Sequence, residues 1–193
     1  KFWNLKCRYS GLRPDCVVIT LSIRALKMHG GVGRIVAGKP LDPGLLEENL
    51  PAIEKGCENL AKHIDTVRQH GLPAVVSVNR FLQDTDKEVE LVQKCAVEAG
   101  AETAVPIEVW AKGGEGGVEL AEAVAAACEK PNHFKFLYTD GASIKEKIET
   151  IARNVYGAIG VDYSPEAEKK IRLYTEQGMD KMPICMAKTH LSL

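Results

Sequence analysis

The sequence predicts an α/β fold: a mostly parallel sheet with helices on both faces, followed by a smaller α/β segment. Apolar runs rich in β-branched residues, typical of strands buried on both faces, occur at residues 16–21 and 73–78. Amphipathic helical patterns follow them at residues 45–70 and 85–99. Short connections join strand to helix, and this alternation favours a parallel sheet covered by helices.

The first strand is predicted at residues 16–21. Residues 23–28 could continue this strand or form a helical turn. The glycines of residues 30–33 break the pattern, and the chain reads as a loop from there to Gly44.

The longest helix is predicted within residues 45–70, where apolar residues recur at steps of three and four. Pro51 lies inside this stretch, so we expect the helix to begin near it, with Asn49 or Leu50 as its N-cap. Gly71 supplies the stop signal.

The next strand and helix are predicted at residues 73–78 and from Asp84 or Thr85, either of which could be the N-cap, to Ala99. A short strand follows at residues 103–109, limited by Pro106. An Ala-rich helix is then predicted from Gly117 to Glu129.

The pattern changes after residue 130. A short strand or extended segment is expected at residues 134–138, and a final strand at 183–187. Between them, Ser143 with Glu146 forms a capping box for a helix to about Tyr156, and Ser164 opens another that ends near Gly178. We therefore expect residues 1–130 to belong to one domain and 131–193 to a smaller segment, truncated at its C-terminus.

Composition narrows the classes of function. A net charge of -1 and a pI near 6.6 do not favour nucleic acid or an anionic membrane as partner. The six cysteines are scattered, without a C-x-x-C pair or a Cys/His cluster at metal-ligand spacing, so we predict no metal site. They are typical of reduced thiols in a reducing compartment, and we expect the cytoplasm.

Polar and aromatic residues follow two neighbouring strands of the predicted sheet. Asn79 and Phe81 come after the strand at 73–78, and Trp110 follows the strand at 103–109. Ligands of open α/β sheets bind at the carboxyl ends of strands, where these two rings could enclose a flat heterocycle. Alternatively, both rings are hydrophobic plugs under loops, and Asn79 only ties the loop backbone.

Charged residues near the same strand ends suggest anion contacts. Arg24 and Lys27 follow the first strand and could contact phosphate or carboxylate, although solvated surface charge is the commoner explanation. Lys112 opens the glycine run at 113–117, a weak phosphate signal at a helix start. The sequence contains no G-x-x-x-x-G-K-[ST] phosphate loop and no clear Ser/His/Asp or Cys/His arrangement, so the catalytic residues stay unknown.

Several blocks of the sequence resemble formate–tetrahydrofolate ligase, also called 10-formyltetrahydrofolate synthetase. The most specific is R-A-L-K-M-H-G-G at residues 24–31. The other blocks lie at residues 6–12, 78–81, 84–85, 110–114 and 183–189.

This resemblance implies a P-loop NTPase-like sheet and an enzyme that joins formate to tetrahydrofolate with ATP, through formyl phosphate. It implies that Phe81 and Trp110 hold the pterin ring, while Asn79, Ala111 and Lys112 border the nucleotide. It further implies ATP with Mg²⁺ and tetrahydrofolate as substrates, no tightly bound cofactor, and a homo-oligomeric parent protein.

Both ends of the chain look cut, so we expect a piece of a longer parent protein, from its middle to its C-terminal part. The resemblance places the phosphate-loop region before residue 1, and we expect the piece to be inactive alone. The alternative is a non-catalytic α/β module for nucleotide binding or assembly.

Overall fold

The computed structural model describes residues 1–33, 35–36 and 38–186. The chain forms two compact units. One contains Pro14–His133, and the other joins Lys1–Arg13 to the described residues from Phe134 onward. The expected domain division of the parent protein near residue 130 stays a prediction, since the compact units of a piece do not define the domains of a longer chain.

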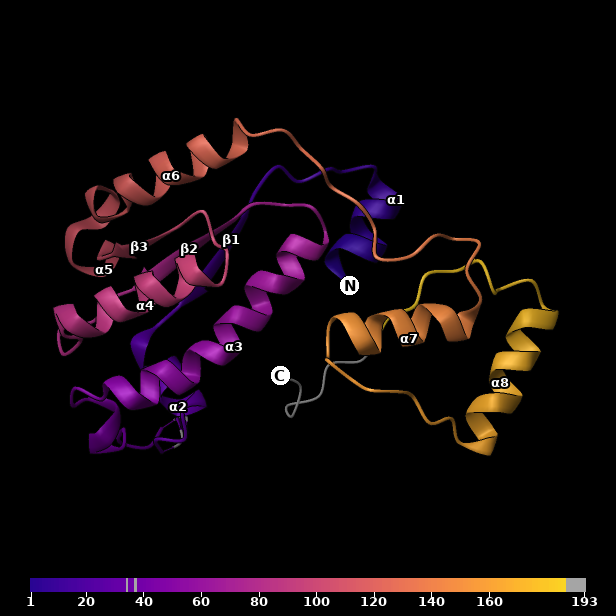
Figure 1. Cartoon of the computed structure of the whole chain (residues 1–193), viewed down its shortest axis with the longest axis horizontal. Helices are drawn as coiled ribbons and strands as arrows, with labels where there is room; N and C mark the ends of the chain where they lie inside the picture. The colour runs from indigo at the N-terminus through magenta and orange to yellow at the C-terminus, as the bar shows by residue number, and fades with distance from the viewer. Residues whose placement is uncertain (34, 37, 187–193) are drawn as a thin grey trace. The chain divides into compact units, whose positions relative to one another are not determined.

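The larger unit is built on a three-stranded parallel sheet of order β1-β2-β3 (Figure 1). Its strands are β1 (Val17–Leu21), β2 (Ala74–Asn79) and β3 (Thr103–Ile107). The central strand β2 is buried along almost its whole length, because it has a neighbour on each side and helices on both faces. The predicted α/β class is confirmed.

Helices cover both faces of this sheet. α3 (Leu50–Gln69) and α4 (Asp86–Glu98) pack on one face, and α6 (Val118–Cys128) packs on the other (Figure 1). The short helix α2 (Ile23–His29) packs on α3, and a 3-10 turn, η2 (Pro43–Leu45), leads towards α3. The stretch 23–28 is therefore helical, because the Ser22 side chain caps it by accepting the Ala25 N–H.

Local signals in the sequence account for the helix ends. Asn49 caps α3 by accepting the Ala52 N–H, and Pro51 lies in the first turn, where it displaces no helical hydrogen bond. Thr85 caps α4 in a capping box with Glu88. Both of these predicted caps are confirmed.

The predicted strand at 103–109 is too long by two residues. β3 ends at Ile107, and Val109 begins the short helix α5 (Val109–Lys112). The Glu108 N–H bonds to the Gly116 carbonyl, and the Glu108 carbonyl accepts the N–H groups of the next turn, so the chain leaves the ladder here. A 3-10 turn, η3 (Gly113–Gly117), then leads into α6.

The smaller unit is helical in its described part. It contains the π-helix η1 (Phe2–Cys7), α1 (Arg8–Ser10), α7 (Ile144–Asn154) and α8 (Pro165–Glu176). A single ammonium joins three of its segments, because the buried Lys147 Nζ donates to the carbonyl oxygens of Asp140, Asp180 and Met182 at 2.9, 2.6 and 3.2 Å.

The strand predicted at 183–187 does not form within its described residues. At 134–138, where a short strand or an extended segment was expected, no strand forms either. At 134–138, side chains replace a strand partner, since Arg8 donates to the Tyr138 carbonyl and Asn4 accepts the Leu137 N–H. At 183–186, the Ile184 N–H bonds to the Tyr138 hydroxyl at 3.0 Å. Ala187, the last residue of the second predicted strand, lies outside the described residues.

Candidate functional site

The carboxyl ends of β2 and β3 lie side by side. Asn79 pairs with Ile107 in the register, and the Arg80 N–H donates to the Ile107 carbonyl at 3.1 Å. The two loops that carry the predicted site residues therefore begin next to each other. The parallel sheet brings them together, as the sequence predicted.

Trp110 lies in α5 and is 53% exposed. Its indole Nε1–H donates to the Arg80 carbonyl at 2.9 Å, which ties the loop after β3 to the loop after β2. The ring is thus held by its polar edge beside the carboxyl ends of β2 and β3. Because it stays half-exposed, it is available to a flat ligand.

Phe81 is partly buried, and its ring lies under the Arg24 guanidinium, with Cζ 4.0 Å from the ring centroid. Arg24 is thus held at the site edge, against a ring, rather than on an open surface. Phe81 and Trp110 each contact a different group, so the structure brings their loops together and gives each ring its own support.

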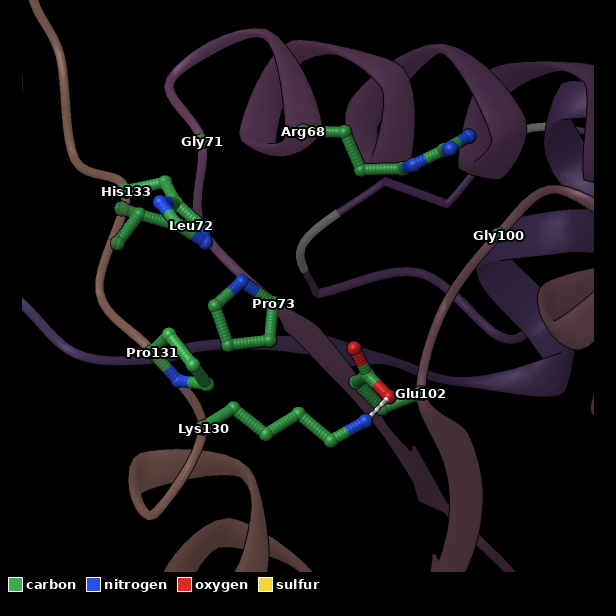
Figure 2. Close-up of a pocket in the computed structure, with 9 residues that line it drawn as sticks. All are labelled: Arg68, Gly71, Leu72, Pro73, Gly100, Glu102, Lys130, Pro131 and His133. Atoms are coloured by element: carbon green, nitrogen blue, oxygen red, sulfur yellow. Dashed lines mark hydrogen bonds and ion pairs between the residues drawn. The ribbon is translucent and has the colours of Figure 1, made fainter.

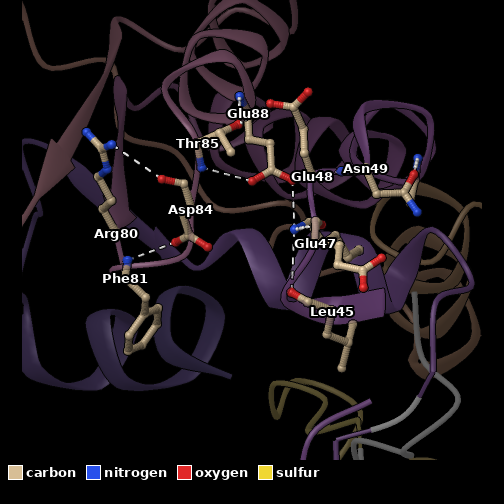
Figure 3. Close-up of polar contacts among 11 residues, drawn as sticks. Leu45, Glu47, Glu48, Asn49, Arg80, Phe81, Asp84, Thr85 and Glu88 are labelled. Carbon is tan, nitrogen blue, oxygen red and sulfur yellow. Dashed lines mark hydrogen bonds and ion pairs between the residues drawn. The ribbon is translucent and has the colours of Figure 1, made fainter. Parts of the chain in front are cut away.

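The turn that carries Phe81 is fixed by a buried carboxylate (Figure 3). Asp84 Oδ2 accepts the Phe81 N–H at 2.8 Å, and Arg80 Nη2 donates to the Asp84 carbonyl at 3.3 Å. Burial raises the pKa of the Asp84 carboxyl, while the bond from Phe81 and the charge of Arg24 oppose this rise. The side chains of Arg80 and Phe81 leave the turn in opposite directions (Figure 3).

Lys27 does not lie on an open surface. Its ammonium is 2.7 Å from Glu88 Oε1 and also donates to the carbonyl oxygens of Glu47, at 2.7 Å, and Leu45, at 3.4 Å. A lysine ammonium has three N–H donors, and three acceptors are in place. The anion contact expected of Lys27 is thus not favoured by this geometry, which gives the side chain a structural role.

A second part of the carboxyl edge contains the residues that we expect beside a nucleotide. Some of them line a cavity there, and the others lie next to it. Lys112 forms an ion pair with Glu108, and this ammonium lowers the pKa of the Glu108 carboxyl. A cavity of about 240 Å³ adjoins the pair. It is lined by Arg80, Pro106, Glu108, Lys112, Glu115, Gly116 and Glu119. Asn79, partly buried at the end of β2, and exposed Ala111 belong to the chain segments that border it.

The glycine run has a local packing reason. A Cβ on Gly116 would lie 2.7 Å from the carbonyl carbon and oxygen of Glu108, so only glycine lets η3 approach the start of α5 this closely. The run therefore shapes the loop that carries Trp110.

A larger pocket of about 340 Å³ lies at the opposite edge of the sheet, before β2 and β3 (Figure 2). Its charged groups have local roles: Lys130 pairs with Glu102, and Arg68 lies in the last turn of α3, where a cation complements the helix dipole. Sequence reasoning did not single out this pocket. The carboxyl edge remains the candidate, because the loops that carry Phe81 and Trp110 meet there.

Two contributors to the site were missed from the sequence, namely the stacking of Arg24 on Phe81 and the buried Asp84 under the turn. The order of the strands could have indicated the first. Because β1 neighbours β2, the residues after β1 meet the loop after β2.

These features define an α/β protein with a candidate ligand site at the carboxyl edge of a parallel sheet, where two ring-bearing loops lie side by side. The sequence model of the family described as formate–tetrahydrofolate ligase matches residues 1–193. The chain belongs to this family, which confirms the resemblance found in the sequence.

Individual relatives agree. Over 193 residues, the chain is 63% identical to the formate–tetrahydrofolate ligase of Desulforamulus reducens, covering 34% of that protein. It is 52% identical to the formate–tetrahydrofolate ligase of Spinacia oleracea, covering 30%. It is 50% identical to the cytoplasmic C-1-tetrahydrofolate synthase of Mus musculus, covering 21%. Each match includes 100% of this chain, which therefore spans about a third or less of these relatives.

Proposed function

We propose that this chain is part of an ATP-dependent ligase that joins formate to N10 of tetrahydrofolate. The observation that carries the proposal is the adjacency of two ring-bearing loops at the carboxyl edge, in a chain of this family. In the parent protein, a formate oxygen would take the terminal phosphoryl group of ATP and release ADP. N10 would then attack the formyl carbon of formyl phosphate, lose its proton and displace phosphate.

Within this scheme, Phe81 and Trp110 hold the pterin ring, and Asn79, Ala111 and Lys112 border the nucleotide. The partial exposure of Trp110 and the fixed turn under Phe81 support the first assignment. The second is supported by the place of Lys112 at the 240 Å³ cavity, because its side chain stays exposed although it pairs with Glu108. We assign no catalytic residue to the chain.

The piece represents the middle to C-terminal part of the parent protein and does not catalyse the ligase reaction alone.

Within residues 1–33, 35–36 and 38–186, no three His, Cys, Asp or Glu side chains gather as metal ligands would. We assign no residue of the chain as a ligand to the Mg²⁺ that accompanies ATP, because this ion takes most of its ligands from phosphate oxygens and water.

We place the parent protein in the cytoplasm, and we infer that it assembles as a homo-oligomer. The name of the mouse relative includes the word cytoplasmic. In the described part of the chain, no helix is both long enough and apolar enough to cross a membrane.

A fluorescence titration tests the folate assignment. The chain has two tryptophans, so a Trp3→Phe background leaves Trp110 as the only indole reporter. We expect tetrahydrofolate, kept reduced, to quench this signal, and Phe81→Leu to weaken binding by roughly tenfold or more, since an aromatic stack is lost. Phe2→Leu, at an exposed ring of the smaller unit, is the matched control and should bind as the background does.

The absence of quenching in a folded chain would contradict the folate assignment. Quenching by ATP but not by tetrahydrofolate would favour the alternative of a nucleotide-binding module. Formyl transfer by this chain alone would contradict the proposal that essential parts lie elsewhere in the parent protein.

A further inference from the structure

The Arg24–Phe81 pair is a defined contact at the proposed folate site. The guanidinium lies over the Phe81 ring at 4.0 Å, and its Nη2 donates to Gln83 Oε1 at 3.1 Å. Within the described part of the chain, the buried Nε–H has no hydrogen-bond acceptor. A buried donor without a partner destabilises the fold, so this stack is not explained by stability alone.

Local contacts hold both members of the pair in place. Arg24 lies in the first turn of α2, a helix that is capped by Ser22 and anchored by the buried side chains of Ile23 and Leu26. Phe81 is held by its own N–H, which donates to the buried Asp84. One face of the ring is therefore assigned to the cation, and a ligand that stacks on Phe81 must use the opposite face.

We infer that Arg24 is a positioning residue that makes the folate site selective for a reduced pterin. This inference rests on the proposed folate function. The guanidinium stays on its face of Phe81 when folate binds, and the order of the stack is Arg24, Phe81, pterin, Trp110.

The selectivity follows from the polarisation of the ring. A cation on one face draws the π electrons of Phe81 towards itself and leaves the opposite face poorer in electrons. The tetrahydropterin ring is electron-rich, because its N5 and N8 amines donate into the pyrimidinone. The fully aromatic pterin of folic acid is electron-poor, so the polarised face favours the reduced ligand.

The planar shape of the guanidinium matters as well as its charge. Arginine stacks flat on a ring and can still donate in its own plane, as Arg24 does to Gln83. Lysine would keep the charge but lack the planar guanidinium. We therefore expect Lys at this position to restore only part of the effect.

The test compares tetrahydrofolate with folic acid in the Trp3→Phe chain, with Trp110 as reporter. We expect Arg24→Met to weaken tetrahydrofolate binding about threefold to tenfold, while folic acid binding changes by less than about twofold. The affinity of the Arg24→Lys chain for tetrahydrofolate should lie between that of the Trp3→Phe background and that of the Arg24→Met chain. Arg13→Met is the matched control, because Arg13 also lies over a phenylalanine ring, that of Phe134 at 5.7 Å, in the smaller unit.

Three outcomes would overturn the inference. Equal loss of both ligands would mean that Arg24 only supports the fold, and no change would mean that it has no role. Tighter binding by Arg24→Met would mean that the guanidinium occupies the face that the pterin needs.

A measurement without folate separates this inference from the proposed function. In the free chain, NMR should show the Arg24 δ protons shifted upfield by the ring current, and Phe81→Leu should abolish the shift. If the shift is present but tetrahydrofolate does not bind, the proposed function fails and the selectivity role fails with it. If tetrahydrofolate binds but the shift is absent, the inference alone fails.

Discussion

The ammonium of Lys27 lies 2.7 Å from the carboxylate of Glu88, and both side chains are almost completely shielded from solvent. Glu88 also accepts the N–H groups of Asn49, at 2.9 Å, and Thr85, at 3.1 Å (Figure 3). One carboxylate thus joins α2 to the N-terminal ends of α3 and α4. Arg24 lies on α2 and Phe81 precedes α4, so the Lys27–Glu88 pair links the two elements next to which the Arg24–Phe81 contact forms.

Removing one partner of this buried pair should strongly destabilise the chain. We expect Lys27→Met, which leaves the Glu88 carboxylate buried without its cation, to lower the free energy of unfolding by about 3–5 kcal/mol. The double variant Lys27→Met with Glu88→Gln should lose less free energy of unfolding than the two single variants lose in sum, because it contains no unpaired buried charge. Urea denaturation measures both effects.

An exposed pair provides the control for this prediction. Lys94 and Glu98 lie 3.9 Å apart on the surface of α4, and Glu98→Gln should change the free energy of unfolding by less than about 0.5 kcal/mol. A Lys27→Met chain as stable as Glu98→Gln would show that the buried pair is not a determinant of the fold.

Substitution of Gly56 should separate α2 from α3. A Cβ there would lie 2.1 Å from the Leu26 carbonyl oxygen, a backbone atom that cannot turn aside. We expect Gly56→Ala to destabilise the chain by about 1–3 kcal/mol or more, measured by urea denaturation. Gly114→Ala, where a Cβ meets nothing within 4 Å, should be nearly neutral, and equal effects would contradict the prediction.

Asp84 should make stability depend on pH in a specific direction. Burial raises its pKa above the ordinary value of 3.8, so the folded chain keeps this proton to a higher pH than the unfolded chain. Between the two pKa values the folded state binds more protons, and the Asp84 contribution to stability therefore falls as pH rises. Asp84→Asn retains an acceptor for the Phe81 N–H and lacks this titration.

We therefore expect the free energy of unfolding of the Asp84→Asn chain to rise relative to that of the unsubstituted chain as pH rises from about 4 to about 7. Urea denaturation at several pH values gives the difference directly, and other titrating groups cancel in it. A stability difference that stays constant with pH, or that changes in favour of Asp84, would rule out the raised pKa.

The cysteines should react with iodoacetamide in a defined order. Cys128 and Cys185 are exposed, whereas burial and the neighbouring Cys95 thiol raise the pKa of Cys57 to about 12. At about pH 8 we expect mass spectrometry to find Cys128 and Cys185 labelled first, and Cys57 only after unfolding. Early labelling of Cys57 in a folded chain would contradict this.

Local signals allowed much of the fold to be predicted. Asn49 before Pro51, and Thr85 three residues before Glu88, marked the starts of α3 and α4 correctly, because a cap depends on neighbours in the sequence. The end of β3 was misplaced because Val109 suits a strand, but the Glu108 N–H bonds to the distant Gly116. At 134–138, where a short strand or an extended segment was expected, bonds from η1 and α1 take the place of a strand partner.

The candidate site was predicted only in outline. Asn79, Phe81 and Trp110 could be placed at strand ends from the sequence, and the structure puts those ends side by side. The partners of Arg24 and Lys27 were not predicted, because Phe81 and Glu88 are distant in sequence. The contact of Arg24 follows from the strand order, and that of Lys27 from the packing of the helices. Whether these residues bind folate and nucleotide stays a prediction.

The ammonium of Lys147 has a consequence for how substitutions should be tolerated. Its acceptors are the main-chain carbonyls of Asp140, Asp180 and Met182, and every amino acid supplies such a carbonyl. The three acceptor positions can therefore change residue type without losing the link, whereas position 147 cannot. In a mutational scan of the smaller unit, the constraint should fall on one lysine rather than on the segments that it joins.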